Sequence, residues 1–125
     1  LEERERLETA RQLMGKARLA GDLAEALRLA AAVADRYPRD RESQLLAGEI
    51  AYRASKWTEA ARYFRTADPG DRQPALLFYF AVSLFESGDR AGAQAMLKRC
   101  LPGLQRTQIV QSYVERILGP QPNPE

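Results

Sequence analysis

The chain has 125 residues, a length that fits one compact domain with a modest hydrophobic core. Its 45% apolar and 29% charged residues are typical of a folded globular protein, and a net charge of +2 gives little reason to expect a nucleic-acid surface. The absence of histidine excludes imidazole catalysis and histidine metal sites, and a single cysteine, Cys100, excludes an internal disulfide.

The first two predicted helices lie on either side of Gly21. In the second of them, Asp22 is a capping residue type, and Glu25 three positions later completes a predicted capping box. Pro38 ends this helix after about Tyr37. Apolar residues of the first helix recur at helical spacing, at Leu7, Ala10, Leu13, Met14 and Ala17.

A second predicted pair begins near Asp40, another capping residue, and is followed by the break "DPGD" at 68–71. Its second helix carries an apolar stripe of Trp57, Ala60, Ala61, Phe64 and Ala67, which we interpret as core. The chain contains no strand pattern.

The third predicted pair opens with "ALLFYFAVSLF" at 75–85, a run in which only Ser83 is not apolar. The run is shorter than the roughly 20 residues of a membrane helix, so we expect no membrane span. The partner helix repeats the core spacing at Ala93, Met96, Leu97, Cys100 and Leu101, and ends at Pro102 and Gly103. We interpret Cys100 as a buried structural thiol.

A seventh helix is predicted over 107–118, with an apolar stripe at Ile109, Val110, Tyr113, Val114, Ile117 and Leu118. An amphipathic helix in this place is suited to covering the open end of a stack of helix pairs. The proline-rich segment 119–125 is predicted to be a flexible tail.

The three pairs repeat one another at a regular interval. Ala26, Ala60 and Ala93 are 34 and 33 residues apart, and each lies five residues after a small turn residue, at Gly21, Ser55 and Gly88. This period and the paired helices resemble the tetratricopeptide repeat (TPR) family. The chain departs from the family pattern where Met14 replaces a small residue, where Gln44 replaces a large apolar one, and where Pro69 comes early.

The resemblance implies an all-α fold: a right-handed α-solenoid of three helix pairs at about 7–40, 41–73 and 74–106, with a capping helix at 107–118, in a domain spanning 1–118. It also implies a non-enzymatic module without cofactor or metal, which binds a partner protein or peptide in a concave groove lined by the first helix of each pair. The nine groove residues expected on this basis are Arg11, Arg18, Leu45, Glu49, Tyr52, Phe78, Tyr79, Val82 and Phe85. The expected groove is basic at its N-terminal end, mixed in the middle, and apolar at its C-terminal end.

Alternatives remain for the apolar stripe of Phe78, Val82 and Phe85. It either receives a partner's helix or extended segment, or is covered by the capping helix or by a second copy of the chain. The second of these readings includes a self-associating dimer. For the chain as a whole, a third hypothesis is that it is an accessory TPR region of a larger enzyme or envelope assembly.

The source and compartment follow only by association. Sixteen arginines against three lysines suit a bacterial genome rich in G and C. Because the chain begins at Leu1 and has no signal-peptide pattern, we expect a domain cut from a longer protein, from either the cytoplasm or the envelope.

Overall fold

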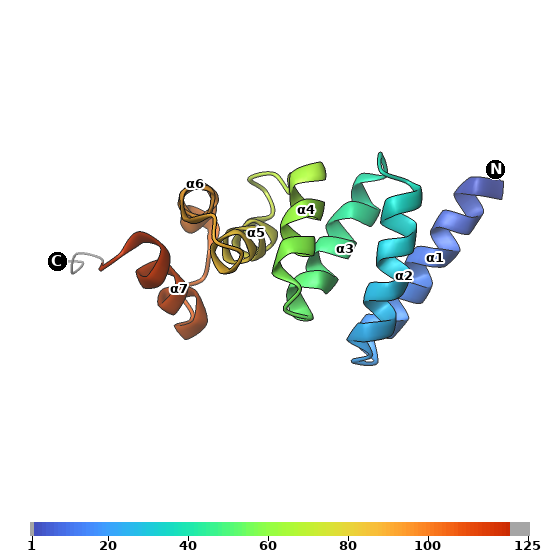
Figure 1. Cartoon of the computed structure of the whole chain (residues 1–125), viewed down its shortest axis with the longest axis horizontal. Helices are drawn as coiled ribbons and strands as arrows, with labels where there is room; N and C mark the ends of the chain where they lie inside the picture. Colours follow the sequence, from blue (N-terminus) through green and yellow to red (C-terminus); the bar gives the residue numbers. More distant parts are fainter. Residues whose placement is uncertain (1, 121–125) are drawn as a thin grey trace. The chain divides into compact units, whose positions relative to one another are not determined.

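The structure is a computed structural model, and it describes residues 2–120. Over this range the chain forms seven α-helices, one short 3₁₀ helix and no strand, which confirms the predicted all-α class (Figure 1). The helices are α1 (Glu2–Leu19), α2 (Leu23–Arg36), α3 (Arg41–Arg53), α4 (Trp57–Thr66), α5 (Pro74–Glu86), α6 (Arg90–Cys100), the 3₁₀ helix η1 (Leu101–Gly103) and α7 (Gln108–Leu118).

The helices belong to two compact units, unit 1 (Leu1–Asp68) with α1 to α4 and unit 2 (Pro69–Glu125) with α5 to α7. Within unit 1, α1 packs on α2, α2 on α3 and α3 on α4. Within unit 2, α5 packs on α6 and α6 on α7. Packing between consecutive helices follows from their short connections, which favour antiparallel neighbours.

The turn within each of the pairs α1–α2, α3–α4 and α5–α6 is built in the same way. One residue adopts the left-handed conformation, with φ of 80° at Gly21, 59° at Ser55 and 96° at Gly88. The next N–H then donates to the carbonyl five residues back, from Asp22 to Ala17, Lys56 to Ala51 and Asp89 to Leu84, at 3.0, 2.8 and 2.8 Å. These bonds form the Schellman motif, which satisfies carbonyls left open at a helix C-terminus.

The repeated alanines lie at the same depth in each pair. Ala26, Ala60 and Ala93 have no exposed surface, and the N–H of each donates to the carbonyl of the residue that caps its helix. The interval seen in the sequence is therefore also an interval of turn geometry and burial.

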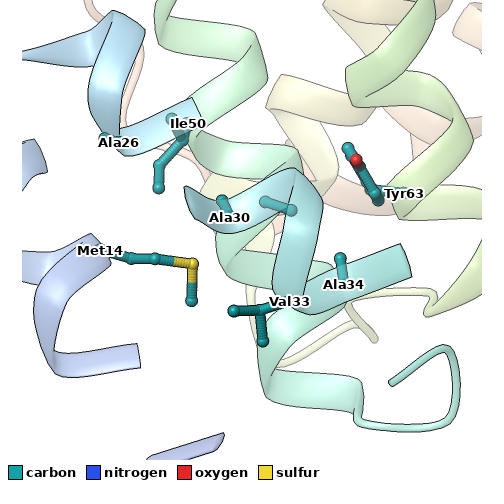
Figure 2. Close-up of a cluster of buried hydrophobic side chains, with 8 residues drawn as sticks. Met14, Ala26, Ala30, Val33, Ala34, Ile50 and Tyr63 are labelled. Carbon is teal, nitrogen blue, oxygen red and sulfur yellow. The ribbon is translucent and has the colours of Figure 1, made fainter. Parts of the chain in front are cut away.

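The core of unit 1 explains why Met14 occupies a slot that holds a small residue elsewhere. Figure 2 shows Met14 reaching from α1 toward α2, where Ala30 and Val33 lie. One repeat later the sizes are exchanged, because Gly48 faces Phe64, and a Cβ on Gly48 would lie 2.8 Å from that buried ring. The pairs Met14 with Ala30 and Gly48 with Phe64 thus fill similar space with opposite distributions of volume, which cores tolerate.

Several predicted boundaries need correction. The carboxylate of Asp22 accepts the N–H of Glu25 as expected, but the Glu25 side chain binds Arg28, so the second half of the capping box is absent. Helix α4 ends at Thr66, one residue before the predicted stripe ends. Thr107 caps α7 rather than belonging to it. Of the predicted tail, residues 121–125 lie outside the described part of the chain.

Candidate partner-binding surface

Arg11, predicted at the basic end of the groove, faces α3 and is enclosed by carboxylates. Its Nη1 lies 3.1 Å from Asp40 Oδ2 and 2.7 Å from Glu42 Oε2, while its Nη2 lies 3.0 Å from Glu8 Oε2. One guanidinium here meets three carboxylates, so this end of the α1–α3 contact is acidic rather than basic. Because both Nη groups already have anionic acceptors and Nε is buried, Arg11 is not available to hold an acidic group of a partner.

The other end of the α1–α3 contact has the opposite balance. Glu49 Oε2 accepts from Arg18 Nη1 at 3.0 Å and from Arg53 Nε at 3.1 Å, so two guanidiniums share one carboxylate. Tyr52 is half-buried beside them, and its ring meets the edge of Trp57 at 5.8 Å between centroids. The net charge of the α1–α3 contact therefore changes from negative at Arg11 to positive at Glu49. The sequence did not indicate this change along the two helices.

Two open hollows adjoin this basic end and share Arg18 and Arg53. The first, of about 380 Å³, is completed by Leu19 and Glu49. The second has a volume of about 530 Å³ and is lined by Arg18, Gly21, Leu23, Tyr52, Arg53, Ser55 and Trp57. Leu45, also predicted for the groove, is half-buried on α3.

In unit 2, helix α7 covers most of the predicted apolar stripe. Phe78 is 4% exposed and Val82 is fully buried, while Phe85 and Tyr79 are half-buried. The ring of Tyr113 meets Phe78 edge-on at 6.0 Å and Phe85 at 6.4 Å. Of the alternatives that the sequence left open, the structure has the capping helix over this stripe, so a partner reaches only the outer parts of Phe85 and Tyr79.

A polar rim closes the contact between α5 and α7. The Arg116 guanidinium carbon lies 5.2 Å from the ring centre of Phe85 and 4.7 Å from that of Tyr113. Glu86 accepts from Arg116 at 3.4 Å and from the Tyr113 hydroxyl at 3.3 Å. The exposed edge of the stripe is thus already bonded within the chain.

The two sets of predicted residues share one physical role. Arg11 and Arg18 of α1, and Phe78 and Phe85 of α5, occupy equivalent repeat positions, and each pair faces the next odd-numbered helix in its own unit. The predicted stripe is therefore largely the contact of α1 with α3 and of α5 with α7. Contacts of this kind use charge in unit 1 and aromatic rings in unit 2.

Six residues that line the hollows were not among the predicted groove residues: Leu19, Gly21, Leu23, Arg53, Ser55 and Trp57. Leu19 is 81% exposed, and Arg53 lines both hollows, while Leu23 and Trp57 line the second one. Trp57 was interpreted as core, whereas it is half-buried at the start of α4. For two of them the sequence held a signal, because Leu19 and Arg53 directly follow the predicted residues Arg18 and Tyr52.

Cys100 offers no reactive thiol. Burial raises the pKa of its thiol to about 11, and its Sγ donates to the Leu97 carbonyl at 3.4 Å. At neutral pH it is therefore protonated, and the thiolate is the reactive form. Residues 2–120 also contain no group of three or more acidic or thiol side chains placed to share a metal ion.

Comparison of the chain with protein-family models, with curated proteins and with solved structures finds no match. Within the described residues, every helix is too short or too polar to cross a bilayer.

Proposed function

We propose that this chain is a non-catalytic protein-interaction module of the TPR type, in which three helix pairs and a closing helix form a right-handed α-solenoid that holds a partner polypeptide. The observation that carries this proposal is that one turn geometry occurs three times in the chain. The same left-handed residue, the same hydrogen bond to the fifth residue back and the same buried alanine recur at 34- and 33-residue spacing. Repeats of this kind stack and present an extended surface of first helices.

The contact surface offered to a partner is smaller than the sequence suggested. Phe78 and Val82 stabilise the chain's own fold, so their burial adds nothing to partner binding. Tyr52, Tyr79 and Phe85 keep partial exposure, and each contributes roughly 1–2 kcal/mol when a partner covers the rest of its apolar surface. Their sum of about 3–6 kcal/mol does not exceed the cost of association, about 4–15 kcal/mol, so stable binding needs further contacts.

Selection from a random peptide library on the immobilised chain tests this proposal. We expect enriched peptides whose affinity falls about tenfold in Tyr52→Ala, because the half-buried ring supplies apolar contact area. Arg28→Ala, at an exposed position of α2, is the matched control and should bind as the native chain does. Failure to enrich any peptide, with the fold verified by circular dichroism, contradicts the proposal.

A second candidate function is self-association through α1. Leu13 is 47% exposed, although its repeat equivalent Ala47 is fully buried against other helices. An open hollow of about 440 Å³ lies beside it, lined by Glu2, Glu5, Arg6, Thr9, Ala10 and Leu13. Light scattering on the native chain and on Leu13→Asp decides this candidate, since a dimer that uses this face dissociates in the variant.

A further inference from the structure

The larger of the two hollows that share Arg18 and Arg53 combines cationic and aromatic side chains, and it lies beside the turns at Gly21 and Ser55. We call it the basic hollow, and it comprises Arg18, Gly21, Leu23, Tyr52, Arg53, Ser55 and Trp57 around about 530 Å³. The ends of α1 and α3 and the starts of α2 and α4 supply most of its lining, and Gly21 and Ser55 belong to the two short turns, so short connections between helices fix the side chains. Rigid elements of this kind favour a preformed binding site.

The charge of the basic hollow suits an anionic group. Two guanidiniums line it, and no carboxylate is among its lining residues. Glu49, outside the hollow, takes Arg18 Nη1 and Arg53 Nε. Within residues 2–120, Glu49 is the only acceptor for Arg18, so Nε and Nη2 of Arg18 keep donors for a ligand oxygen. Guanidinium donors of this geometry bind carboxylates in pairs.

The remaining wall is apolar, which distinguishes this hollow from a general anion site. Tyr52 and Trp57 meet edge-on, and Leu23 completes the surface. Leu19, which lines the adjoining hollow together with the same two arginines, is 81% exposed. A ligand that fits all of these groups carries a carboxylate next to an aromatic or aliphatic side chain.

The surroundings favour a short acidic segment over a long polyanion. Arg11 lies among the carboxylates of Glu8, Asp40 and Glu42. It is seven residues before Arg18 on α1, which is about 10 Å along the helix axis. A nucleic-acid backbone running along the α1–α3 contact would meet this acidic cluster and be repelled.

We propose that the basic hollow binds an acidic peptide segment, with a carboxylate between Arg18 and Arg53 and the neighbouring apolar side chain against Tyr52 and Trp57. This assignment rests on the proposed function and names the chemistry of the partner.

Trp57 makes the test specific to this site, because it is the single tryptophan of the chain. The probe is a short peptide that alternates aspartate with leucine and phenylalanine and has blocked ends. Its controls are the same peptide with asparagine for aspartate, the same peptide with a free C-terminus, and a single-stranded oligonucleotide. Calorimetry reports binding anywhere on the chain, and protection of Trp57 fluorescence from acrylamide reports binding in the basic hollow.

We expect the acidic peptide to bind and to protect Trp57, with affinity falling at high salt. Arg18→Gln should weaken binding at least tenfold, since it removes a charge-assisted hydrogen bond. Arg28→Gln, which removes an equal charge from the exposed face of α2, should leave it unchanged. The asparagine peptide should bind more weakly than the acidic one, and tighter binding only with the free C-terminus would identify the terminal carboxylate as the bound group.

The possible failures separate the two proposals. If calorimetry detects the peptide but Trp57 stays unprotected, or if Arg18→Gln binds normally, the basic hollow is not the site, while a protein-interaction role survives. Preference for the asparagine peptide or for the oligonucleotide overturns the chemistry assigned here. Absence of acidic-peptide binding also overturns it, and only the library selection described above then decides the interaction role.

Discussion

At the scale of single residues, Gln44 shows why a polar side chain is buried in the contact between α2 and α3. The carbonyl of Ala34 in the last turn of α2 lacks its usual helical donor, because residue 38 is proline and has no N–H. Gln44 Nε2 donates to this carbonyl at 2.8 Å, and both residues are buried. Gln44, which stands where the repeat pattern has a large apolar residue, thus supplies the hydrogen bond that Pro38 cannot donate.

Gln44→Leu is therefore expected to destabilise the chain although it makes the core more apolar. The buried Ala34 carbonyl loses its donor, which costs roughly 1–3 kcal/mol and exceeds the gain from added apolar burial. Urea unfolding followed by circular dichroism measures the difference. Gln12→Leu, at an exposed position of α1, is the control and should stay within about 0.5 kcal/mol of the native chain. An unchanged midpoint in Gln44→Leu would remove the capping role.

At the scale of elements, the turn between α3 and α4 differs from its two counterparts in one residue. Ser55 holds φ of 59°, where the other turns have glycine. A residue with a Cβ pays about 1–2 kcal/mol in this conformation, whereas glycine loses more entropy on folding, by about 0.4–1 kcal/mol. The net preference at these sites is for glycine.

The sign of this preference can be measured in both directions. Ser55→Gly should stabilise the chain by about 0.5 kcal/mol, and Gly21→Ser should destabilise it by a similar amount. A Cβ on Gly21 meets no atom within 4 Å, so the cost there is conformational and not steric. Thermal unfolding of both variants measures these shifts. The same sign for both substitutions would mean that contacts outside the turns dominate.

The contact of α7 with α5 depends on one aromatic side chain. Tyr113 joins Phe78, Phe85 and Glu86, so Tyr113→Ala should destabilise unit 2 by about 2–3 kcal/mol. Tyr113→Phe keeps the ring and removes only the hydroxyl bond to Glu86, which should cost less than about 1 kcal/mol. Urea midpoints compare the two variants, and equal losses would assign the stability to the hydroxyl instead of the rings.

At the scale of the whole molecule, the sequence predicted local structure better than the surface it presents. The ends of α2, the caps Asp22 and Asp40 and the repeated alanines were foreseen, because capping and helical period depend on neighbours within a few residues. The placement of Phe78 and Arg11 depends on partners about 30 residues away, Tyr113 and Asp40. A helical stripe indicates that such residues are covered or paired, but not by which helix.

Alkaline pH provides a test of unfolding that depends on one buried group. Cys100 is 1% exposed, and its pKa is raised from an ordinary value near 9 to about 11, chiefly because burial disfavours the thiolate. Below about pH 9 the thiol is protonated in both states and its contribution is constant. Between about pH 9 and about pH 11 the unfolded chain releases this proton and the folded chain keeps it, so stability falls as the pH rises.

Across that interval the free energy of unfolding should fall by roughly 2–3 kcal/mol because of Cys100, since the pKa values of its thiol in the folded and unfolded chain differ by about two. Tyrosines and lysines also titrate in this range, so the quantity to measure is the difference between the native chain and Cys100→Ala. At neutral pH the native chain should be the more stable of the two, because alanine leaves a small cavity. Urea midpoints taken toward high pH should bring the two chains together, since only the native chain carries the thiol. A constant difference up to about pH 11 would mean that the thiol ionises in the folded chain as readily as in the unfolded one, which its burial at the end of α6 forbids.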